Sequence, residues 1–254
     1  MITNSSLVLL FLSIVLSIKL NAQGPPITLT APGTLGFQGS AIRTFGTFSN
    51  FDDKSVYTQV FAVPYNVSTN FQIGVIGRYS FMNPDGMSGI NGFNNSTLFL
   101  KHQLYAKNDI GKTFRISGLV RQSFPTAKKG IGLEIYQTYV GLVAGDISTK
   151  RGFYTNLGYN ITSHGSPDNF QYDFSAGIPL LPQVYPLKQL NSFIELNGNT
   201  ALKGKNHVLF LSPGLQLIRG SFLIEGSFQI PIVQEVESNS DNKFKVLFGT
   251  RILI

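Results

Sequence analysis

The sequence predicts an all-β protein, an antiparallel up-and-down transmembrane β-barrel of about twelve strands in one domain. Three observations predict it. Apolar and polar residues alternate along about a dozen segments, only 13% of the residues are charged, and long and short connections between the segments take turns. An ordinary globular protein has about 25% charged residues, so this chain would have difficulty covering itself with a water-soluble surface.

The composition excludes several classes of protein. Hydrophobic residues are 43% of the chain, and no stretch approaches 18 consecutive apolar residues, which argues against membrane helices. There is no cysteine, so disulfides and thiolate metal sites are excluded. The formal charge of +7 comes from basic residues spread thinly along the chain, with no run longer than a pair such as Lys128-Lys129. A nucleic-acid binder usually clusters its basic residues, so we expect no nucleic-acid partner.

The N-terminus has the pattern of an export signal. Residues 7–18 read LVLLFLSIVLSI, which is too short for a membrane span and suits the core of a signal peptide. Small Ala22 marks the expected cleavage point, although the first six residues lack Lys and Arg, and an N-terminal anchor helix is the alternative. We therefore expect a signal peptide over 1–22 and a barrel domain over 23–254, with a formal charge of +6 once Lys19 is removed.

The period of two is clearest over residues 222–232. The even positions are apolar, except for Gly226, and the odd positions from Glu225 to Gln229 are polar. Successive side chains of a strand point to opposite faces, so such a strand has one apolar and one polar face. Residues 70–82, 168–179 and 243–254 alternate in the same way.

Reading every such run predicts twelve strands, most of them long enough for the 9–11 tilted residues that cross a bilayer. They lie near 35–47, 55–65, 70–82, 96–107, 112–123, 132–144, 150–162, 168–179, 187–199, 206–218, 220–232 and 243–254. The first, second, fourth and sixth alternate less cleanly, so their boundaries are the least defined.

The connections distinguish a membrane barrel from a β-sandwich, which also alternates. Long connections at 83–95, 124–131 and 233–242 follow odd-numbered strands, and tight turns at 66–69, 108–111 and 219 follow even-numbered ones; 181–186 is a longer turn. Outer-membrane barrels have long external loops and short periplasmic turns. The polar positions are also mostly Ser, Gln, Asn or Gly, whereas the outer face of a sandwich carries many charges. With twelve strands the lumen should be narrow, holding or passing a small molecule at most.

Several short segments occur in an order that resembles the outer-membrane transporter family named for the meta-pathway of phenol degradation. They are FPT at 124–126, NLGY at 156–159, ELNG at 195–198, LSPGLQ at 211–216 and QIPI at 229–232, so the resemblance covers roughly 124–254. It implies a barrel in the outer membrane of a Gram-negative bacterium, with a role in moving small, often hydrophobic compounds. Proteins of this kind commonly end in Phe, and this chain ends in Ile254.

Strand parity places charged residues on the polar, inward face. Basic residues gather on strands three to five, which lie about opposite strands nine to eleven in a ring of twelve. The acidic residues are on strands eight, nine and eleven. The inward set is Arg78, Lys101, Arg115, Arg121, Asp173, Glu195, Glu225, Lys243, Lys245 and Arg251. Such walls could set up a transverse field that orients a polar solute in an open passage. The alternative is that the charges pair across a packed lumen and close it.

Aromatic residues share the inward face, where they could form an apolar path for a ligand or simply fill space. They are Phe99, Tyr105, Tyr154, Phe193 and Phe210. The residues predicted to line the lumen or contact a ligand are Arg78, Lys101, Arg115, Arg121, Tyr154, Asp173, Phe193, Glu195, Phe210, Glu225 and Arg251.

No catalytic or metal-binding pattern stands out, so we expect no enzyme activity and no cofactor. Outer-membrane phospholipases use a Ser–His pair on a twelve-stranded barrel, but His164 lies in a Gly/Pro turn, a poor platform for a general base. His102 shares the parity of the outward leucines. Residues 24–34 are too few to form a plug domain.

The sequence therefore predicts a passive outer-membrane transporter for small, hydrophobic or aromatic molecules. The alternative is a closed structural or surface-binding barrel. The expected partners are outer-membrane lipid, lipopolysaccharide, a small solute and the barrel-assembly machinery. Loop lysines such as Lys128 and Lys203 could touch lipopolysaccharide phosphates, or simply be solvated.

Overall fold

The computed structural model describes residues 25–163, 167–181, 188–204, 206–236 and 241–254. The predicted signal peptide lies outside these residues, as does nearly all of the predicted turn 181–186. Within the described ranges there is no helix long and apolar enough to cross a membrane.

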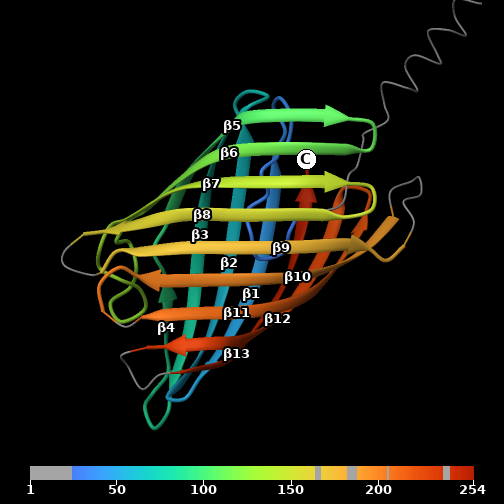
Figure 1. Ribbon diagram of the computed structural model, residues 1–254. Coiled ribbons are helices and arrows are strands. Elements are labelled where there is room, and N and C mark those ends of the chain that lie inside the picture. The colour runs from blue at the N-terminus through green and yellow to red at the C-terminus, as the bar shows by residue number, and fades with distance from the viewer. Residues whose placement is uncertain (1–24, 164–166, 182–187, 205, 237–240) are drawn as a thin grey trace, which may run out of the picture.

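Thirteen strands form in the described residues, and twelve of them close into one antiparallel ring (Figure 1). They are β1 (Ala41–Phe51), β2 (Lys54–Asn66), β3 (Phe71–Pro84), β4 (Ile90–Phe93), β5 (Thr97–Asp109), β6 (Lys112–Ser123), β7 (Gln137–Ser148), β8 (Gly152–Thr162), β9 (Asn169–Pro179), β10 (Lys188–Ala201), β11 (His207–Arg219), β12 (Phe222–Glu235) and β13 (Asn242–Leu253).

The ring closes because β1 pairs with β2 on one side and with β13 on the other. All other ring strands pair with their neighbours in chain order, and β3 pairs directly with β5. In Figure 1, β5 to β10 cross the front of the view and β1 to β3 run behind them. The predicted twelve-stranded antiparallel barrel is confirmed.

The two ends of the barrel differ in their connections. At one end the strands are joined by the brief links 67–70, 110–111, 149–151 and 220–221, which we call the short-turn end. The other, the long-loop end, carries the connections 85–96 and 124–136, although the link 52–53 at this end is also short. Both Ala41 and Leu253 lie at the short-turn end, where β1 and β13 pair.

Three strands depart from the sequence prediction. β1 begins at Ala41 instead of near 35, because Gly36 and Gln38 take positive φ values of 91° and 57° and form a turn. β7 begins at Gln137 instead of near 132, because the preceding loop folds onto β4: Lys128 N–H donates to Phe93 C=O at 2.9 Å. β4 forms within the predicted loop 83–95 by pairing with the end of β3.

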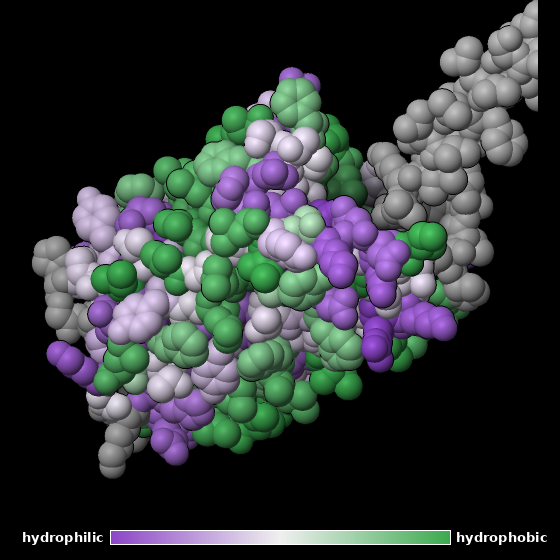
Figure 2. All heavy atoms as spheres, turned by 45° about the horizontal axis from the view of Figure 1, so that its top comes forward, coloured by the Kyte–Doolittle hydropathy of each residue, from purple (hydrophilic) through white to green (hydrophobic). Residues whose placement is uncertain are grey.

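The outside of the barrel is apolar and the inside is polar, as alternation requires. On β12, Phe228, Ile230 and Ile232 are exposed on the outside, while Glu225 and Ser227 are buried inside. Hydrophobic side chains cover much of the wall that faces the viewer in Figure 2. The buried core of this protein therefore lies within the lumen.

Candidate functional site

The lumen holds a stretch of the chain's own backbone, residues 25–35, which we call the lumen segment. Ile27 and Leu29 within it are 0% and 3% exposed, and Pro26 and Pro32 are fully buried. Side chains from β1, β5, β6, β8, β10 and β11 hydrogen-bond to its backbone. Proline-rich extended segments leave their own backbone polar groups unpaired, so those groups are available to the barrel wall.

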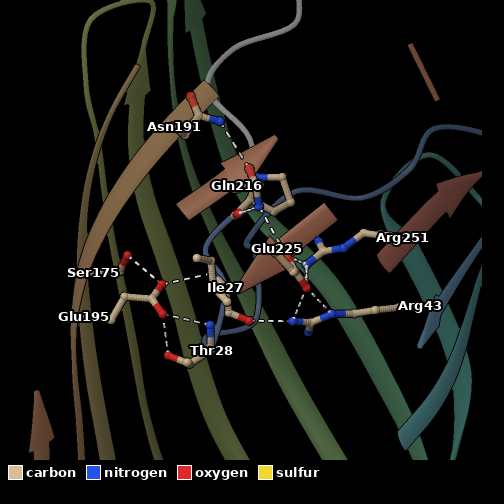
Figure 3. Close-up of polar contacts among 10 residues, drawn as sticks. Ile27, Thr28, Arg43, Ser175, Asn191, Glu195, Gln216, Glu225 and Arg251 are labelled. Atoms are coloured by element: carbon tan, nitrogen blue, oxygen red, sulfur yellow. Dashed lines mark hydrogen bonds and ion pairs between the residues drawn. The ribbon is translucent and has the colours of Figure 1, made fainter. Parts of the chain in front are cut away.

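Glu195 on β10 is the main acceptor for this segment (Figure 3). Its carboxylate accepts hydrogen bonds from the N–H groups of Ile27 at 2.9 Å and Thr28 at 2.8 Å, and from the Thr28 hydroxyl at 2.6 Å. Ser175 Oγ donates a fourth at 2.9 Å. A buried carboxylate needs several donors to offset its lost hydration, and the lumen segment supplies three of the four.

Lys101 on β5 binds the same segment through its carbonyl groups. Its Nζ donates to Ala31 C=O at 3.0 Å and to Gly33 C=O at 2.6 Å. Ser117 on β6 donates to Pro32 C=O at 2.6 Å. The acidic and basic walls therefore do not meet each other, because the lumen segment lies between them and uses both.

Near the short-turn end, Glu225 on β12 forms the one lumenal ion cluster found among the described residues. Arg43 Nη2 lies 2.6 Å from Glu225 Oε1, and Arg251 Nη2 lies 3.2 Å from Oε2. Gln216 links this cluster to the lumen segment by donating to Glu225 at 3.2 Å and to Pro25 C=O at 2.8 Å (Figure 3). These ion pairs join the adjacent strands β1, β12 and β13, not opposite walls.

An apolar cluster surrounds the first half of the lumen segment. Ile27 and Leu29 pack with Tyr154 and Phe193, both predicted from parity, and with Ile147 and Leu247. Glycine makes room for this packing, since a Cβ at Gly214 would lie 2.6 Å from Ile27 Cδ1. Tyr154 and Phe193 thus stabilise the position of the segment.

The remaining predicted lumen residues also face inward. Arg121 stacks its guanidinium 3.9 Å from the Tyr139 ring centre and donates to Gln171 at 3.1 Å. Arg78 donates to Asn95 C=O and Thr97, whereas Arg115 donates to Thr113. Asp173 accepts hydrogen bonds from Gln171 and Asn197. Lys245 Nζ lies over the ring of Phe210, 4.0 Å from the ring centre. Contact of these residues with a ligand remains a prediction.

Two residues placed on the inward face by parity lie elsewhere. Tyr105 is 50% exposed on the outer wall, because a bulge between Gln103 and Tyr105 inserts one residue into β5 and reverses the parity beyond it. Lys243 lies at the rim of the long-loop end, half exposed, with its Nζ 3.1 Å from Asp52. None of the ion pairs among the described residues joins opposite walls of the lumen, as the alternative of a lumen closed by paired charges would require.

The sequence did not predict that Arg43 faces the lumen, or that residues 25–35 are buried in it. Arg43 lies on β1, whose alternation is weak and whose predicted range started six residues early. Residues 24–34 are too few for a plug domain, yet residues 25–35 occupy the lumen as one extended segment outside the β-sheet. Their sequence signal was the uncharged, proline-containing run ahead of the first strand.

The histidines do not form a catalytic group in the described residues. His102 lies on the outer wall beside Phe71, with the ring centres 6.0 Å apart. His207 contacts the Thr200 hydroxyl at 2.6 Å and the Tyr172 hydroxyl at 3.5 Å. His164 lies outside the described residues.

A cavity of about 390 Å³ remains between the lumen segment and the barrel wall. It reaches from Arg121 and Phe99 in the interior to Gly220 and Ser221 at the short-turn end. Four of the residues that line it are basic, and apolar side chains supply much of the rest. The lumen is therefore narrowed by the segment, and space for a small molecule remains beside it.

No family model matches this sequence, and no curated protein matches it. Among solved structures, the chain is similar to the COG4313 outer membrane channel from Pseudomonas putida F1, with a TM-score of 0.70 and 9% identity over 90% of this chain and 100% of that chain. It shares that protein's fold. The β domain of the Bordetella autotransporter BrkA is less similar, with a TM-score of 0.49 and 10% identity over 85% of this chain and 99% of that chain.

Proposed function

We propose that this protein is a passive channel or transporter for small molecules in the outer membrane of a Gram-negative bacterium. The cavity beside the lumen segment carries the proposal, because it gives a narrow barrel space for a solute. The shared fold with an outer membrane channel supports it. The resemblance of residues 124–254 to the phenol meta-pathway family supports hydrophobic or aromatic solutes.

The outer wall supports placement in a bilayer. Its exposed strand residues are predominantly apolar, and the twelve ring strands are each paired on both sides, which is how a β-sheet can cross hydrocarbon. Aromatic side chains are exposed toward both ends, as in the aromatic girdles of outer-membrane barrels. Toward the short-turn end they are Tyr65, Tyr105, Phe114, Phe153 and Phe222; toward the long-loop end they are Tyr57, Phe81, Phe93 and Phe170.

The proposed orientation follows from the connections. Short turns face the periplasm in outer-membrane barrels, so the cavity would open toward the periplasm and the long loops would face outward. Export through the signal peptide 1–22 and insertion by the barrel-assembly machinery belong to the same proposal. Lipopolysaccharide would then surround the long-loop end.

A closed barrel that conducts nothing is the second candidate, and the lumen segment favours it. The segment is buried and held by six strands. Single-channel recording in planar bilayers tests both candidates, using the full chain and a variant that lacks residues 25–34. We expect small discrete steps from the full chain and larger steps from the deletion.

Two other outcomes have definite meanings. Steps from the deletion alone would support the closed barrel. If neither protein conducts, although both show the heat-modifiable gel migration of a folded barrel, the channel proposal is wrong.

A further inference from the structure

The charge of the lumen is unbalanced. Seven basic residues face it in the described strands, Arg43, Arg78, Lys101, Arg115, Arg121, Lys245 and Arg251, against the three acids Asp173, Glu195 and Glu225. The acids are occupied by the hydrogen bonds and ion pairs described above. The excess positive charge therefore has no acidic partner among the described residues.

Four of the seven basic residues line the cavity beside the lumen segment. Arg43, Lys101, Arg121 and Arg251 line it, and none of the described residues that line it is acidic. Arg43 and Arg251 share the single carboxylate of Glu225. Neither Lys101 nor Arg121 has a carboxylate within ion-pair distance in the part of the chain that the structure describes.

Lys101 and Arg121 make their own hydrogen bonds to neutral groups, and Arg121 reaches the carboxylate of Asp173 only through Gln171. Lys101 donates to two neutral carbonyl oxygens, and an ammonium has three N–H donors. Arg121 has one hydrogen bond to an amide oxygen and one stacked ring, out of five N–H donors. Arg251 Nε is buried and has no hydrogen-bond partner among the described residues.

The proximity of Lys101 to other basic residues of the lumen also favours an anion. Lys101 and Arg115 both approach Gly33, because Lys101 donates to its C=O and a Cβ added there would lie 3.3 Å from Arg115 Nη1. Arg251 lines the same cavity as Lys101. Like charges in a partly desolvated site repel one another much more strongly than in water. A bound anion would relieve this repulsion while accepting the unused donors.

Apolar side chains supply most of the rest of the cavity lining. Leu29, Phe99, Leu119, Ile147, Tyr154 and Leu223 line it. Ligand pockets of about 300–1,000 Å³ are typical for small molecules, so about 390 Å³ suits a small ligand with an apolar body. A purely inorganic anion would leave this apolar surface unused.

We propose that the cavity beside the lumen segment binds small amphipathic carboxylates, with the carboxylate between Lys101 and Arg121 and the aromatic or aliphatic body on the apolar lining. The inference rests on the proposed function, since it names the substrate class of the same lumen. It adds a requirement for negative charge that a path for neutral hydrophobic compounds would not have.

The experiment compares three ligands of one shape by isothermal titration calorimetry, using the full folded chain in a neutral detergent. The ligands are 4-phenylbutyrate, its neutral amide and the corresponding amine. We expect the carboxylate to bind at least tenfold more tightly than the amide, and the amine not to bind. Equal affinity for carboxylate and amide, tighter binding of the amine, or no binding of any ligand would overturn the proposal.

Variants locate the site. Arg121→Gln should weaken carboxylate binding at least tenfold, and Arg121→Lys should retain part of it because the charge is kept. Lys243→Gln is the matched control, since it removes one positive charge at the rim and should leave affinity unchanged. Equal losses in Arg121→Gln and Lys243→Gln would overturn the assignment, because long-range charge alone would then explain binding.

The outcomes separate this inference from the proposed function. Charge-selective binding without conductance in planar bilayers would support the site and contradict the channel. Conductance without any preference for the carboxylate would support the channel and overturn the site. Heat-modifiable gel migration of each variant confirms that the barrel is folded, and Lys101→Gln provides an independent second variant with the same expected loss as Arg121→Gln.

Discussion

Glu195 and Lys101 bind the same piece of backbone from different sides of the barrel. The Glu195 carboxylate accepts the N–H groups of Ile27 and Thr28, and Lys101 Nζ donates to the C=O groups of Ala31 and Gly33. Four strands, β6 to β9, separate β5 from β10 on the shorter way around the ring, so the segment spans the lumen between them. The acidic wall thus binds the N–H groups of the lumen segment, and the basic wall binds its C=O groups.

Replacing Glu195 with Gln should loosen the lumen segment. The amide keeps one acceptor oxygen but presents an NH₂ group to N–H donors, and hydrogen bonds to charged groups are each worth about 1.5–3 kcal/mol. We expect the free energy of unfolding to fall by about 3 kcal/mol and the single-channel current to rise. Glu235→Gln, exposed at the end of β12, is the control and should change neither quantity.

Replacing Glu225 with Gln should destabilise the barrel more. Arg43 and Arg251 would remain as neighbouring positive charges without a carboxylate, and loss of one side of a buried ion pair costs about 3–5 kcal/mol. Urea unfolding in detergent measures this loss. Adding Arg43→Gln should recover part of it; a double variant no more stable than Glu225→Gln would show that repulsion is not the cause.

The double variant of Arg115→Gln and Arg121→Gln should change ion selectivity. It lowers the formal charge of the lumen by two while Glu195 and Glu225 remain, and charges in a narrow, partly desolvated passage are weakly screened. We expect the reversal potential under a salt gradient to shift toward cations. An unchanged reversal potential in a conducting variant would mean that ions do not pass these side chains.

Phe228→Arg tests the outer face. Phe228 is 43% exposed on the outer wall, and an arginine near the middle of a bilayer costs about 2–4 kcal/mol. Gln229→Arg, one residue along, points into the polar lumen beside Lys245, where the new charge does not enter hydrocarbon, and we expect a smaller loss. Equal losses in the free energy of unfolding, measured in lipid vesicles, would contradict the assignment of the two faces.

Closure of the ring predicts heat-modifiable migration on gels. Pairing of β1 with β13 closes the ring of twelve strands, so detergent alone should not unfold the barrel, and the unboiled protein should migrate differently from the boiled one. Identical migration of both samples would argue against a closed ring.

The alternation of residues was sufficient to predict the barrel and the faces of most strands. On β9 and β12 the period of two places Asp173 and Glu225 inward without ambiguity, because side-chain direction along a regular strand is a local property of the backbone. The same rule fails at Tyr105, where a bulge in β5 depends on pairing with β6 and is not encoded in the alternation.

The sequence by itself determined the twelve strands of the ring, the apolar outside and most of the inward charges, since these follow from local periodicity. Only the tertiary structure decided what the charges bind. Ile27 and Glu195 are 168 residues apart and meet because the ring closes around the lumen segment. Closure brings six strands to one stretch of backbone, and the unpaired backbone groups of that stretch take the hydrogen bonds that side-chain patterns alone would assign to ion pairs across the lumen.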